Sequence, residues 1–507
     1  RGRGAPMAAR SGVTLGDLDD FISPSQACVK PIRADPKRST ARIQLEDDPG
    51  APAPGQAVAQ ISLSDCLACS GCVTSAETVL ITAQSAGELR ARLEARDHDV
   101  VVTVSPAARA SLAAHYGVDP ATAQLRLRSA LRRLGCAEVL DCGAAADLSL
   151  CEAAAEFVAH LRASGAPHRA PGPRQPLLCA ACPGVVCFLE KQHGWLLPRL
   201  SAVRSPQQVM GALVRRWLEP RAPRPVYHAA VMPCFDKKLE AARADFAGPG
   251  PEPGRPGRRD VDCVLSTQEV AELLEAQGLS LGDDPGLGEE GVSEEAWPGT
   301  GPAAAALNNL DPAQGAFRAP PGGSGGWAEF LFRVAAQEVF GRPLGEEAVP
   351  WVQGRNADWR EATLPGPDGA PALRVAVTHG FRNIQNVVRR AKAGTLPYDY
   401  VELMACPGGC LNGGGQARVQ GGDVRAGRAR LEAVKEAHRG DAGGAVLGWP
   451  DPAGDARLRA FYGPGGLFQG GPLSPAARAL LHTQYHAVQD EEMAGPAVAT
   501  PALAVNW

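Results

Sequence analysis

The residues best suited to chemistry lie near the end of the chain, where two cysteines four positions apart flank proline and glycine. Residues 404–416 read MACPGGCLNGGGQ, and the two thiols belong to Cys406 and Cys410. Proline stops a helix from forming across the pair, and glycines without side chains let the backbone close tightly over something large. Such a loop suits an inorganic cluster, with a tight turn carrying two incidental thiols as the alternative.

A second group of cysteines lies near the start of the chain. Cys66, Cys69 and Cys72 are separated by two residues each, as in the cluster-binding run of bacterial-type ferredoxins. The usual fourth Cys-Pro does not follow shortly after, so Cys28 is the natural fourth ligand. Zinc also takes four thiolates, but zinc motifs usually come as two separated Cys-x2-Cys pairs. The spacing therefore favours an iron–sulfur cluster over zinc.

Two further cysteines follow expected strands, as Cys406 and Cys410 do. Cys182 comes after an apolar stretch at 177–179, and Cys234 comes after one at 226–232. Ligands of open parallel sheets gather at the carboxyl ends of strands, so these four thiols are expected to converge from three loops. Four thiolates are what a [4Fe–4S] cluster requires, and scattered structural cysteines are the alternative.

The remaining cysteines downstream of residue 75 have a simpler interpretation. They are expected to be buried apolar thiols, and two of them, Cys179 and Cys187, are candidates to lie beside the cluster ligands. The full set is Cys136, Cys142, Cys151, Cys179, Cys187 and Cys263.

Composition limits the classes of function. The 507 residues are 45% hydrophobic and 21% charged, with a formal net charge of -4. Nothing in that balance suggests steering toward nucleic acid or an anionic membrane, and we find no apolar run of about 18 residues. Fourteen cysteines that cluster in a long chain without a secretory signal favour reduced thiolates serving metal.

The elements that must position these thiols alternate between strand and helix. Short apolar strands alternating with amphipathic helices imply a parallel, helix-covered sheet. The expected strands are 78–82, 100–104, 138–140, 177–179, 226–232, 373–378 and 400–404. The expected helices are 106–115, 121–134, 145–161, 206–218, 383–393 and a terminal helix over 474–486 that begins Ser-Pro.

We divide the chain into four parts. These are an N-terminal iron–sulfur domain at 1–75, a first α/β lobe at 76–225, a second α/β lobe at 226–470, and a C-terminal helix and tail at 471–507. Stretches near 245–260 and 280–326 are rich in Gly, Pro, Ala and acid, and they are expected to be insertions or flexible loops without a core of their own.

Taken together, these motifs resemble a known family, the hydrogenase-like (nuclear prelamin A recognition factor-like) proteins of cytosolic iron–sulfur cluster assembly, related to [FeFe]-hydrogenases. The matching segments are 17–32, 66–72, 181–191, 231–241, 401–416 and 480–488. The resemblance implies a hydrogenase-like α/β fold, with doubly wound parallel sheets in two lobes around a central [4Fe–4S] site. It also implies a small N-terminal cluster-binding domain.

The resemblance implies two [4Fe–4S] clusters. It gives one to Cys28, Cys66, Cys69 and Cys72, and the other to Cys182, Cys234, Cys406 and Cys410. In hydrogenases the cysteine matching Cys410 also bridges to a di-iron centre with CO and cyanide ligands.

Three positions bear on hydrogenase chemistry. The proton-relay cysteine of hydrogenases is Ala181 here, which weighs against hydrogen chemistry, whereas Lys237 stands where they place a lysine near a cyanide ligand. A Trp common in both families is Val185 here, which puts the local packing in doubt but not the ligands.

The C-terminal residue, Trp507, is either the stray end of a tail or an aromatic anchor. Proteins similar to this one end in Trp, and such a tail is recognised by the cytosolic iron–sulfur targeting complex, a WD-repeat protein and associated factors. The resemblance further implies early scaffold proteins as partners, no nucleic acid and no membrane. The expected localisation is cytoplasmic, with the nucleus left open as a second compartment.

Three functions compete at this point. The first is a non-catalytic assembly factor that links an early scaffold to the late targeting complex for maturation of cytosolic and nuclear iron–sulfur proteins. The second is an [FeFe]-hydrogenase-type oxidoreductase, and the third is a prelamin-binding interaction protein. The missing relay thiol disfavours the second, and the N-terminal cysteine set suits the first better than the third.

Overall fold

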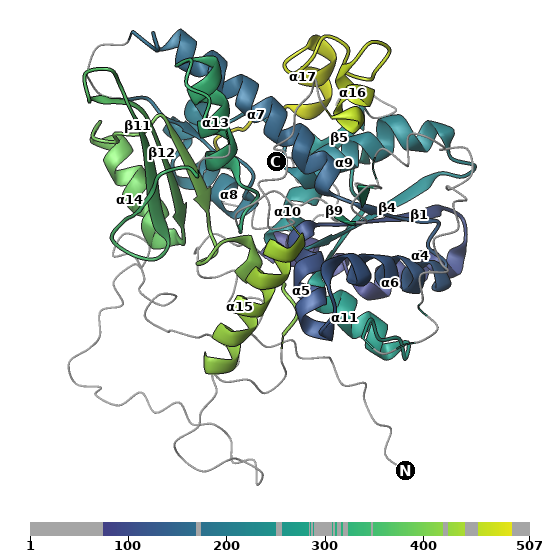
Figure 1. Cartoon of the computed structure of the whole chain (residues 1–507). Helices are drawn as coiled ribbons and strands as arrows, with labels where there is room; N and C mark the ends of the chain where they lie inside the picture. Colours follow the sequence, from purple (N-terminus) through teal and green to yellow (C-terminus); the bar gives the residue numbers. More distant parts are fainter. Residues whose placement is uncertain are drawn as a thin grey trace, which may run out of the picture.

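Two sheets, each covered by helices, stand side by side in the computed structural model of the chain (Figure 1). The structure describes residues 75–168, 174–249, 256–282, 323–345, 348–418, 424–441 and 455–488, together with 284, 287, 307, 310–311 and 316–317. Within this part of the chain, no helix combines the length and the apolar character that a membrane crossing needs.

The first sheet is entirely parallel, in the order β2-β1-β4-β7. Its strands are β1 (Asp99–Val104), β2 (Glu138–Asp141), β4 (Val226–Met232) and β7 (Cys263–Ser266), and all their residues are buried. Helices α4 (Ala86–Ala95), α5 (Pro106–Tyr116), α6 (Pro120–Arg133) and α11 (Thr267–Ala276) pack on one face. Helices α7 (Gly143–Ala163) and α9 (Pro206–Leu213) pack on the other, which makes this sheet doubly wound.

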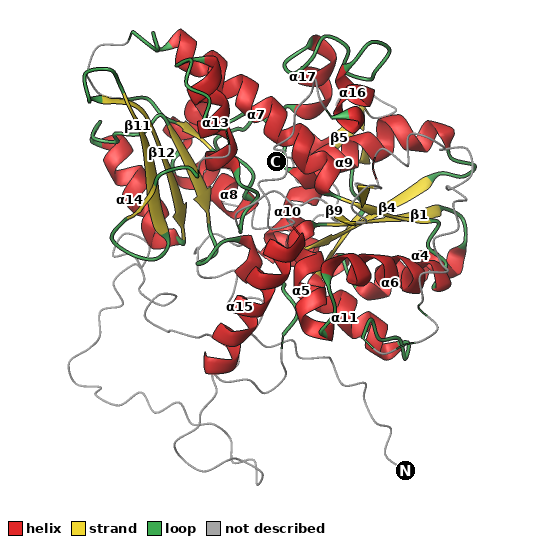
Figure 2. Cartoon of the chain, viewed as in Figure 1, coloured by secondary structure: helices red, strands yellow, loops and turns green. Residues whose placement is uncertain are grey.

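The second sheet is mixed, in the order β10-β11-β12-β13-β3 (Figure 2). Its strands are β3 (Leu177–Leu178), β10 (Trp351–Gln353), β11 (Trp359–Pro365), β12 (Pro371–His379) and β13 (Tyr400–Met404). β12, β13 and β3 are parallel, and β10 and β11 add antiparallel strands at one edge. Helices α8 (Pro183–Gln192) and α14 (Phe381–Lys392) cover one face, and α13 (Trp327–Glu338) covers the other.

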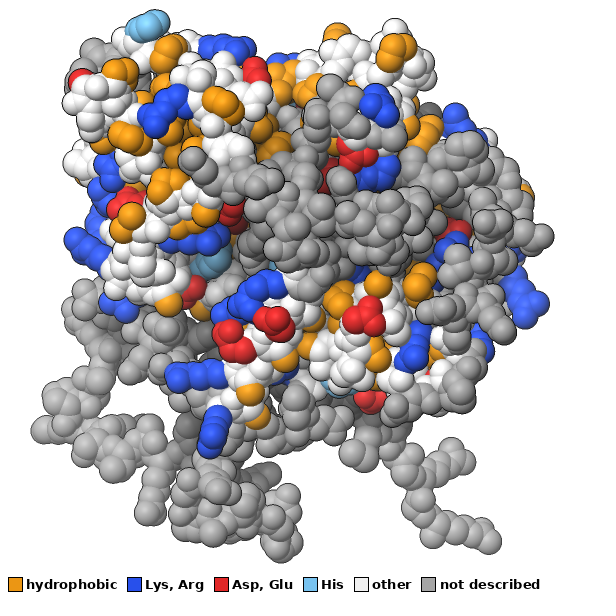
Figure 3. Space-filling model, in the orientation of Figure 1, with side chains coloured by type: hydrophobic (Ala, Val, Ile, Leu, Met, Phe, Trp, Pro, Cys, Tyr) orange, Lys and Arg blue, Asp and Glu red, His pale blue; other side chains and the backbone are white. Residues whose placement is uncertain are grey.

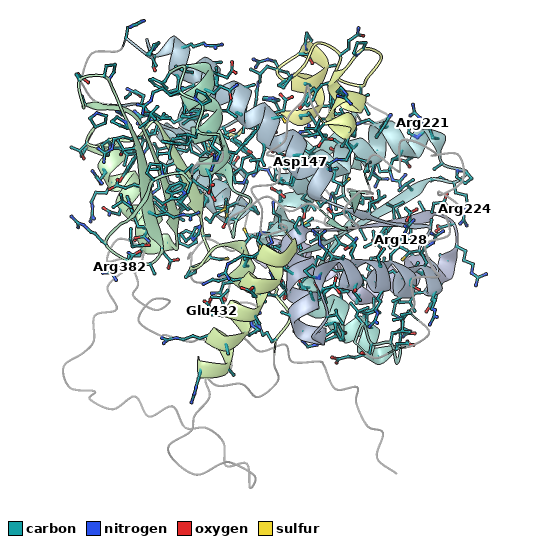
Figure 4. All side chains as sticks on the ribbon, in the orientation of Figure 1. Arg128, Asp147, Arg221, Arg224, Arg382 and Glu432 are labelled. Atoms are coloured by element: carbon teal, nitrogen blue, oxygen red, sulfur yellow. The ribbon has the colours of Figure 1, made fainter. Side chains whose placement is uncertain are left out.

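One long helix, α7, joins the two halves. Its first half, including Ala145 and Leu148, packs in the core of the first sheet, whereas Phe157 and Leu161 in its second half pack in the core of the second. Figure 4 labels Asp147 on this helix. Asp147 pairs at 3.1 Å with Arg457 of α16 (Ala456–Tyr462), so the C-terminal helices are fastened to the same element.

Strands that follow one another in the chain do not always belong to the same sheet. β3 precedes β4 in sequence but lies in the second sheet, whereas β4 and β7 return to the first. The boundary expected between residues 225 and 226 therefore does not separate the two sheets. The expected insertions also contribute to the cores, because Leu281, Leu287 and Leu307 are fully buried there.

The strand expected at 78–82 is wrong. Residues Ser75–Ala83 form a helix, α3, despite their β-branched side chains, because tertiary contacts outweigh local propensity. The residue that follows, Gln84, donates at 2.8 Å to the Lys238 carbonyl and accepts at 3.0 Å from the Val264 amide. These bonds fasten the end of α3 between α10 (Asp236–Ala242) and β7.

The terminal helix expected over 474–486 is shorter than predicted. α17 (Pro475–Leu481) starts as expected, with the Ser474 hydroxyl accepting from the Ala477 amide, but it ends at Leu481. Residues 482–488 then bond to other segments, through a bridge of His482 to Val203 and a 3.0 Å bond from the Val488 amide to the Glu190 carbonyl. Those external bonds replace the helical ones.

Charged side chains of both signs are scattered over the described part of one face of the molecule. In the described part of the face shown in Figure 3, Lys and Arg are interspersed with Asp and Glu and with apolar side chains.

Candidate iron–sulfur site

The first thiol of the candidate site, that of Cys182, lies between β3 and α8. Cys182 is the N-cap residue of α8, and Pro183 occupies the first helical position, where its missing N–H costs nothing. The Ala405 amide donates to the Cys182 sulfur at 3.5 Å. This contact joins the turn after β3 to the turn after β13.

The second thiol, that of Cys234, lies in the turn between β4 and α10, and the glycine-rich loop lies against that turn. The Gly415 amide donates at 2.9 Å to the Pro233 carbonyl. A Cβ atom at Gly413 would lie 2.3 Å from the Pro233 oxygen, and one at Gly415 would lie 3.3 Å from the Cys234 Cα. Glycine is thus required because two backbones meet here.

The third and fourth thiols belong to one turn after β13. The Gly409 amide donates at 3.0 Å to the Cys406 carbonyl, and Cys410 opens a short 3-10 turn, Cys410–Asn412. Gly408 and Gly409 have φ values of +72° and +80°, a region that side chains disfavour. The next residue, Leu411, packs with Ala110 of α5 and Val434 of α15 (Val424–Asp441), which anchors the loop.

The four thiols interact with one another. Burial raises the pKa of Cys234 well above its usual value, and Cys406, Cys182 and Cys410 raise it further. Burial likewise raises the pKa of Cys406, with added contributions from Cys182 and Cys410. The structure thus brings these cysteines together from three loops, and each of the four residues is partly exposed.

A single metal ion and a four-iron cluster require different arrangements of four thiols. Among the described residues, no group of three or more His, Cys, Asp or Glu side chains is arranged to hold a metal ion. A single zinc ion needs four sulfurs about 2.3 Å from one centre, whereas a four-iron cluster spreads four thiolates over four irons. A set of four mutually interacting thiols fits the larger group by the chemistry of its donors.

Two charged side chains of α10 flank the thiols. Asp236 contributes to raising the pKa of Cys182, Cys234 and Cys406, in addition to burial. The ammonium of Lys237 donates to the Ala181 carbonyl at 3.2 Å and to Glu240 at 2.9 Å. Burial lowers the pKa of Lys237, but Glu240 and two thiols outweigh burial and raise it overall.

The other predicted site residues have different outcomes. Cys28, Cys66, Cys69, Cys72 and Trp507 lie outside the described residues. Of the left-over cysteines, Cys136, Cys142, Cys151, Cys179 and Cys263 are buried as expected, whereas Cys187 is partly exposed. Cys179 lies within electrostatic range of Cys182, and Cys187 within range of Asp236.

Sequence reasoning missed three residues at the site, namely Ser324, His379 and Asp358. Ser324 falls in a Gly-rich stretch that we expected to be an insertion, yet its hydroxyl accepts from the Cys410 amide at 3.2 Å. The one available signal was a histidine at the end of an apolar strand, since His379 ends β12.

Comparison with known proteins adds a family context. The profile described as "Iron only hydrogenase large subunit, C-terminal domain" matches residues 98–414. The chain is 41% identical over 495 residues to "Cytosolic iron-sulfur assembly component 3" of Rattus norvegicus, covering 94% of this chain and 96% of the relative. It is 38% identical over 487 residues to "Protein NAR1" of Arabidopsis thaliana, with the same two coverages.

Among solved structures, the chain is similar to a variant of the [FeFe]-hydrogenase HydA1 from Chlamydomonas reinhardtii. The TM-score is 0.60 at 26% sequence identity, and the match covers 79% of this chain and 98% of that one. The expected hydrogenase-like α/β fold is therefore confirmed.

Proposed function

Because this chain belongs to the family of the cytosolic iron–sulfur assembly components, we propose that it acts in the assembly of cytosolic iron–sulfur proteins as a carrier of clusters and not as a hydrogenase. The Rattus norvegicus relative is named as an assembly component, and neither of the names given above describes an enzyme. The fold alone would not separate the two roles, because one fold hosts many functions.

The observation that carries this proposal is the convergence of four thiols from three strand ends. Cys182, Cys234, Cys406 and Cys410 would hold one [4Fe–4S] cluster. When bound, such a cluster supplies a one-electron carrier and a store of iron and sulfide. The chain's own residues position the thiols through the N-cap of α8 and through the close glycine contact at Gly413.

A second [4Fe–4S] cluster belongs to the N-terminal part of the proposal. Its ligands would be Cys28, Cys66, Cys69 and Cys72, and the ferredoxin-like spacing of the last three supports it. With two clusters, the protein would link early scaffold proteins to the late targeting complex. The compartment would be the cytoplasm, as the names of the relatives suggest, and the nucleus as well.

The C-terminal Trp507 would be the contact with the targeting complex. An aromatic side chain offers a large apolar anchor for a partner's pocket. Deleting Trp507 is expected to weaken capture of the WD-repeat protein in a pull-down from the same quantity of cluster-loaded protein. Equal capture by the full-length and truncated chains would contradict this assignment.

A hydrogenase function is the second candidate, and the match over residues 98–414 to the iron-only hydrogenases favours it. Against it, the position of the relay thiol is Ala181, and the ammonium of Lys237 donates to the carbonyl of that alanine. A methyl group cannot carry a proton, so a hydrogenase route at this position has no side-chain donor.

Infrared spectroscopy separates the two candidates. We expect anaerobically purified protein, with iron and sulfide confirmed in the same sample, to show no bands where metal-bound CO and cyanide absorb. The reason is that a carrier of cubane clusters needs thiolate ligands only. Bands in that window, together with hydrogen evolution from a reduced dye, would overturn the proposal in favour of the hydrogenase.

A further inference from the structure

Three polar side chains from three separate segments form a row that ends at Cys410. Asp358 precedes β11, His379 ends β12, and Ser324 lies shortly before α13. The Asp358 carboxylate lies 3.7 Å from Nδ1 of His379, and Nε2 of His379 lies 3.4 Å from the Ser324 hydroxyl. The row runs from a partly exposed carboxylate, with 28% of its side chain accessible, to Ser324, which is 9% exposed.

Ser324 contacts the cysteine turn closely. Its hydroxyl oxygen accepts from the Cys410 amide at 3.2 Å, and the Leu411 amide donates to the neighbouring Gly323 carbonyl, also at 3.2 Å. A Cβ atom at Gly409 would lie 2.2 Å from the Ser324 oxygen. Only a glycine with φ of +80° therefore lets the turn come this close.

Asp358, at the other end of the row, also bonds to the turn that carries Cys406 and Cys410. The Gly408 amide donates to Asp358 at 2.6 Å. Burial raises the pKa of Asp358, but the nearby His379 ring and the bond from the Gly408 amide outweigh burial and lower it overall, so the carboxylate stays ionised near neutral pH. An anion facing Nδ1 favours a proton on that nitrogen and leaves Nε2 as the acceptor for the serine hydroxyl.

The same three residue types form the catalytic triads of hydrolases. Here the serine oxygen is engaged by a backbone amide and is covered by Gly409, so a substrate carbonyl has no approach to it. The row instead serves the cysteine turn.

We propose that Ser324, held by His379 and Asp358, is a positioning residue for Cys410 that determines how firmly a cluster is retained at this ligand. This inference rests on the proposed function. Groups that orient a metal ligand commonly tune affinity and redox potential.

The test compares Ser324→Ala with Ser111→Ala in the full-length, anaerobically loaded protein. Ser111 is a matched control, because it is also buried and its hydroxyl accepts a backbone amide of the glycine-rich segment, that of Ala417 at 3.2 Å. We expect Ser324→Ala to release iron to a chelator about five to ten times faster than wild type, the effect of one lost hydrogen bond. We also expect a changed midpoint potential for the cluster held by Cys182, Cys234, Cys406 and Cys410, because the turn that carries one ligand loses a bond to its backbone.

A second variant, His379→Gln, distinguishes a specific effect of the serine hydroxyl from a general loss of structure. Its amide keeps an acceptor near the serine hydroxyl, so it is expected to release iron more slowly than Ser324→Ala but faster than wild type. Wild-type release rate and potential in Ser324→Ala would overturn the inference, and so would equal changes in Ser111→Ala.

A further variant, Cys410→Ala, separates this failure from that of the proposed function. If Cys410→Ala keeps the full iron content, the ligand assignment itself is wrong. If it loses iron while Ser324→Ala behaves as wild type, only the inference about Ser324 fails.

Discussion

Replacing Cys234 by Ala is expected to remove the cluster proposed for Cys182, Cys234, Cys406 and Cys410, since a [4Fe–4S] cluster needs four thiolates. The iron content should then fall from about eight to about four atoms per chain. Cys234 is the appropriate target because its thiol interacts with all three of the others. Alanine fits the same turn, which leaves the contact between Pro233 and Gly415 in place. The loss is therefore expected to be one of metal binding and not of folding.

Three measurements check this prediction. Iron and sulfide per chain should fall by half, the thermal midpoint of the loaded protein should fall toward that of the metal-free protein, and client iron–sulfur enzymes should lose activity in cells that depend on the variant. The matched control is Cys136→Ala, which removes a buried thiol whose pKa is raised by burial alone. Full iron content in Cys234→Ala would contradict the ligand set.

Replacing Arg243 by Met is expected to destabilise the packing of residues 482–488 by about 3–5 kcal/mol. This is the cost of leaving the buried Glu190 carboxylate without its charged partner. The guanidinium bonds to both oxygens of Glu190 at 2.6 and 2.7 Å, and both side chains are almost fully buried. It also lies over the ring of Tyr485 at 5.7 Å. Without it, Glu190 keeps a 3.2 Å bond from the His486 amide.

Hydrogen exchange and denaturant unfolding would measure this effect. The amides of residues 482–488 should exchange faster, because Glu190 fastens that segment to α8. Arg439→Met is the control, since Arg439 forms an exposed ion pair with Glu436, and a change within about 0.5 kcal/mol is expected there. Equal effects of the two substitutions would show that the buried pair does not hold the C-terminal segment.

β1 and two of the strands that precede the thiols, β4 and β13, could be predicted because most of their residues are apolar. β1, β4 and β13 are buried throughout, as the apolar runs indicated. The position of Cys182, Cys234, Cys406 and Cys410 just after such runs was enough to predict their convergence. This follows from the geometry of parallel sheets, in which carboxyl ends meet at one edge.

Other features could not be predicted, for physical reasons. β11 mixes buried and partly exposed residues without strict alternation, and its pairing with β12 is set by tertiary contacts. β3 pairs over only two residues, so nothing local shows which sheet it joins. Ser324, His379 and Asp358 come from three segments with no fixed spacing, and their contact depends on a glycine conformation that sequence alone does not reveal.

Segments that are far apart in the chain meet at the candidate site, so the parts of this site are synthesised at different times. The Ala405 amide and the Cys182 sulfur touch, although they lie 223 positions apart in the chain. A ribosome that adds about 5–20 residues per second needs roughly 10–45 seconds to cover that separation. The thiols of Cys182 and Cys234 must therefore remain reduced, without Cys406 and Cys410 beside them, until β13 and its turn have been synthesised. A cluster at this site could therefore be completed only late in synthesis, once the turn after β13 has emerged.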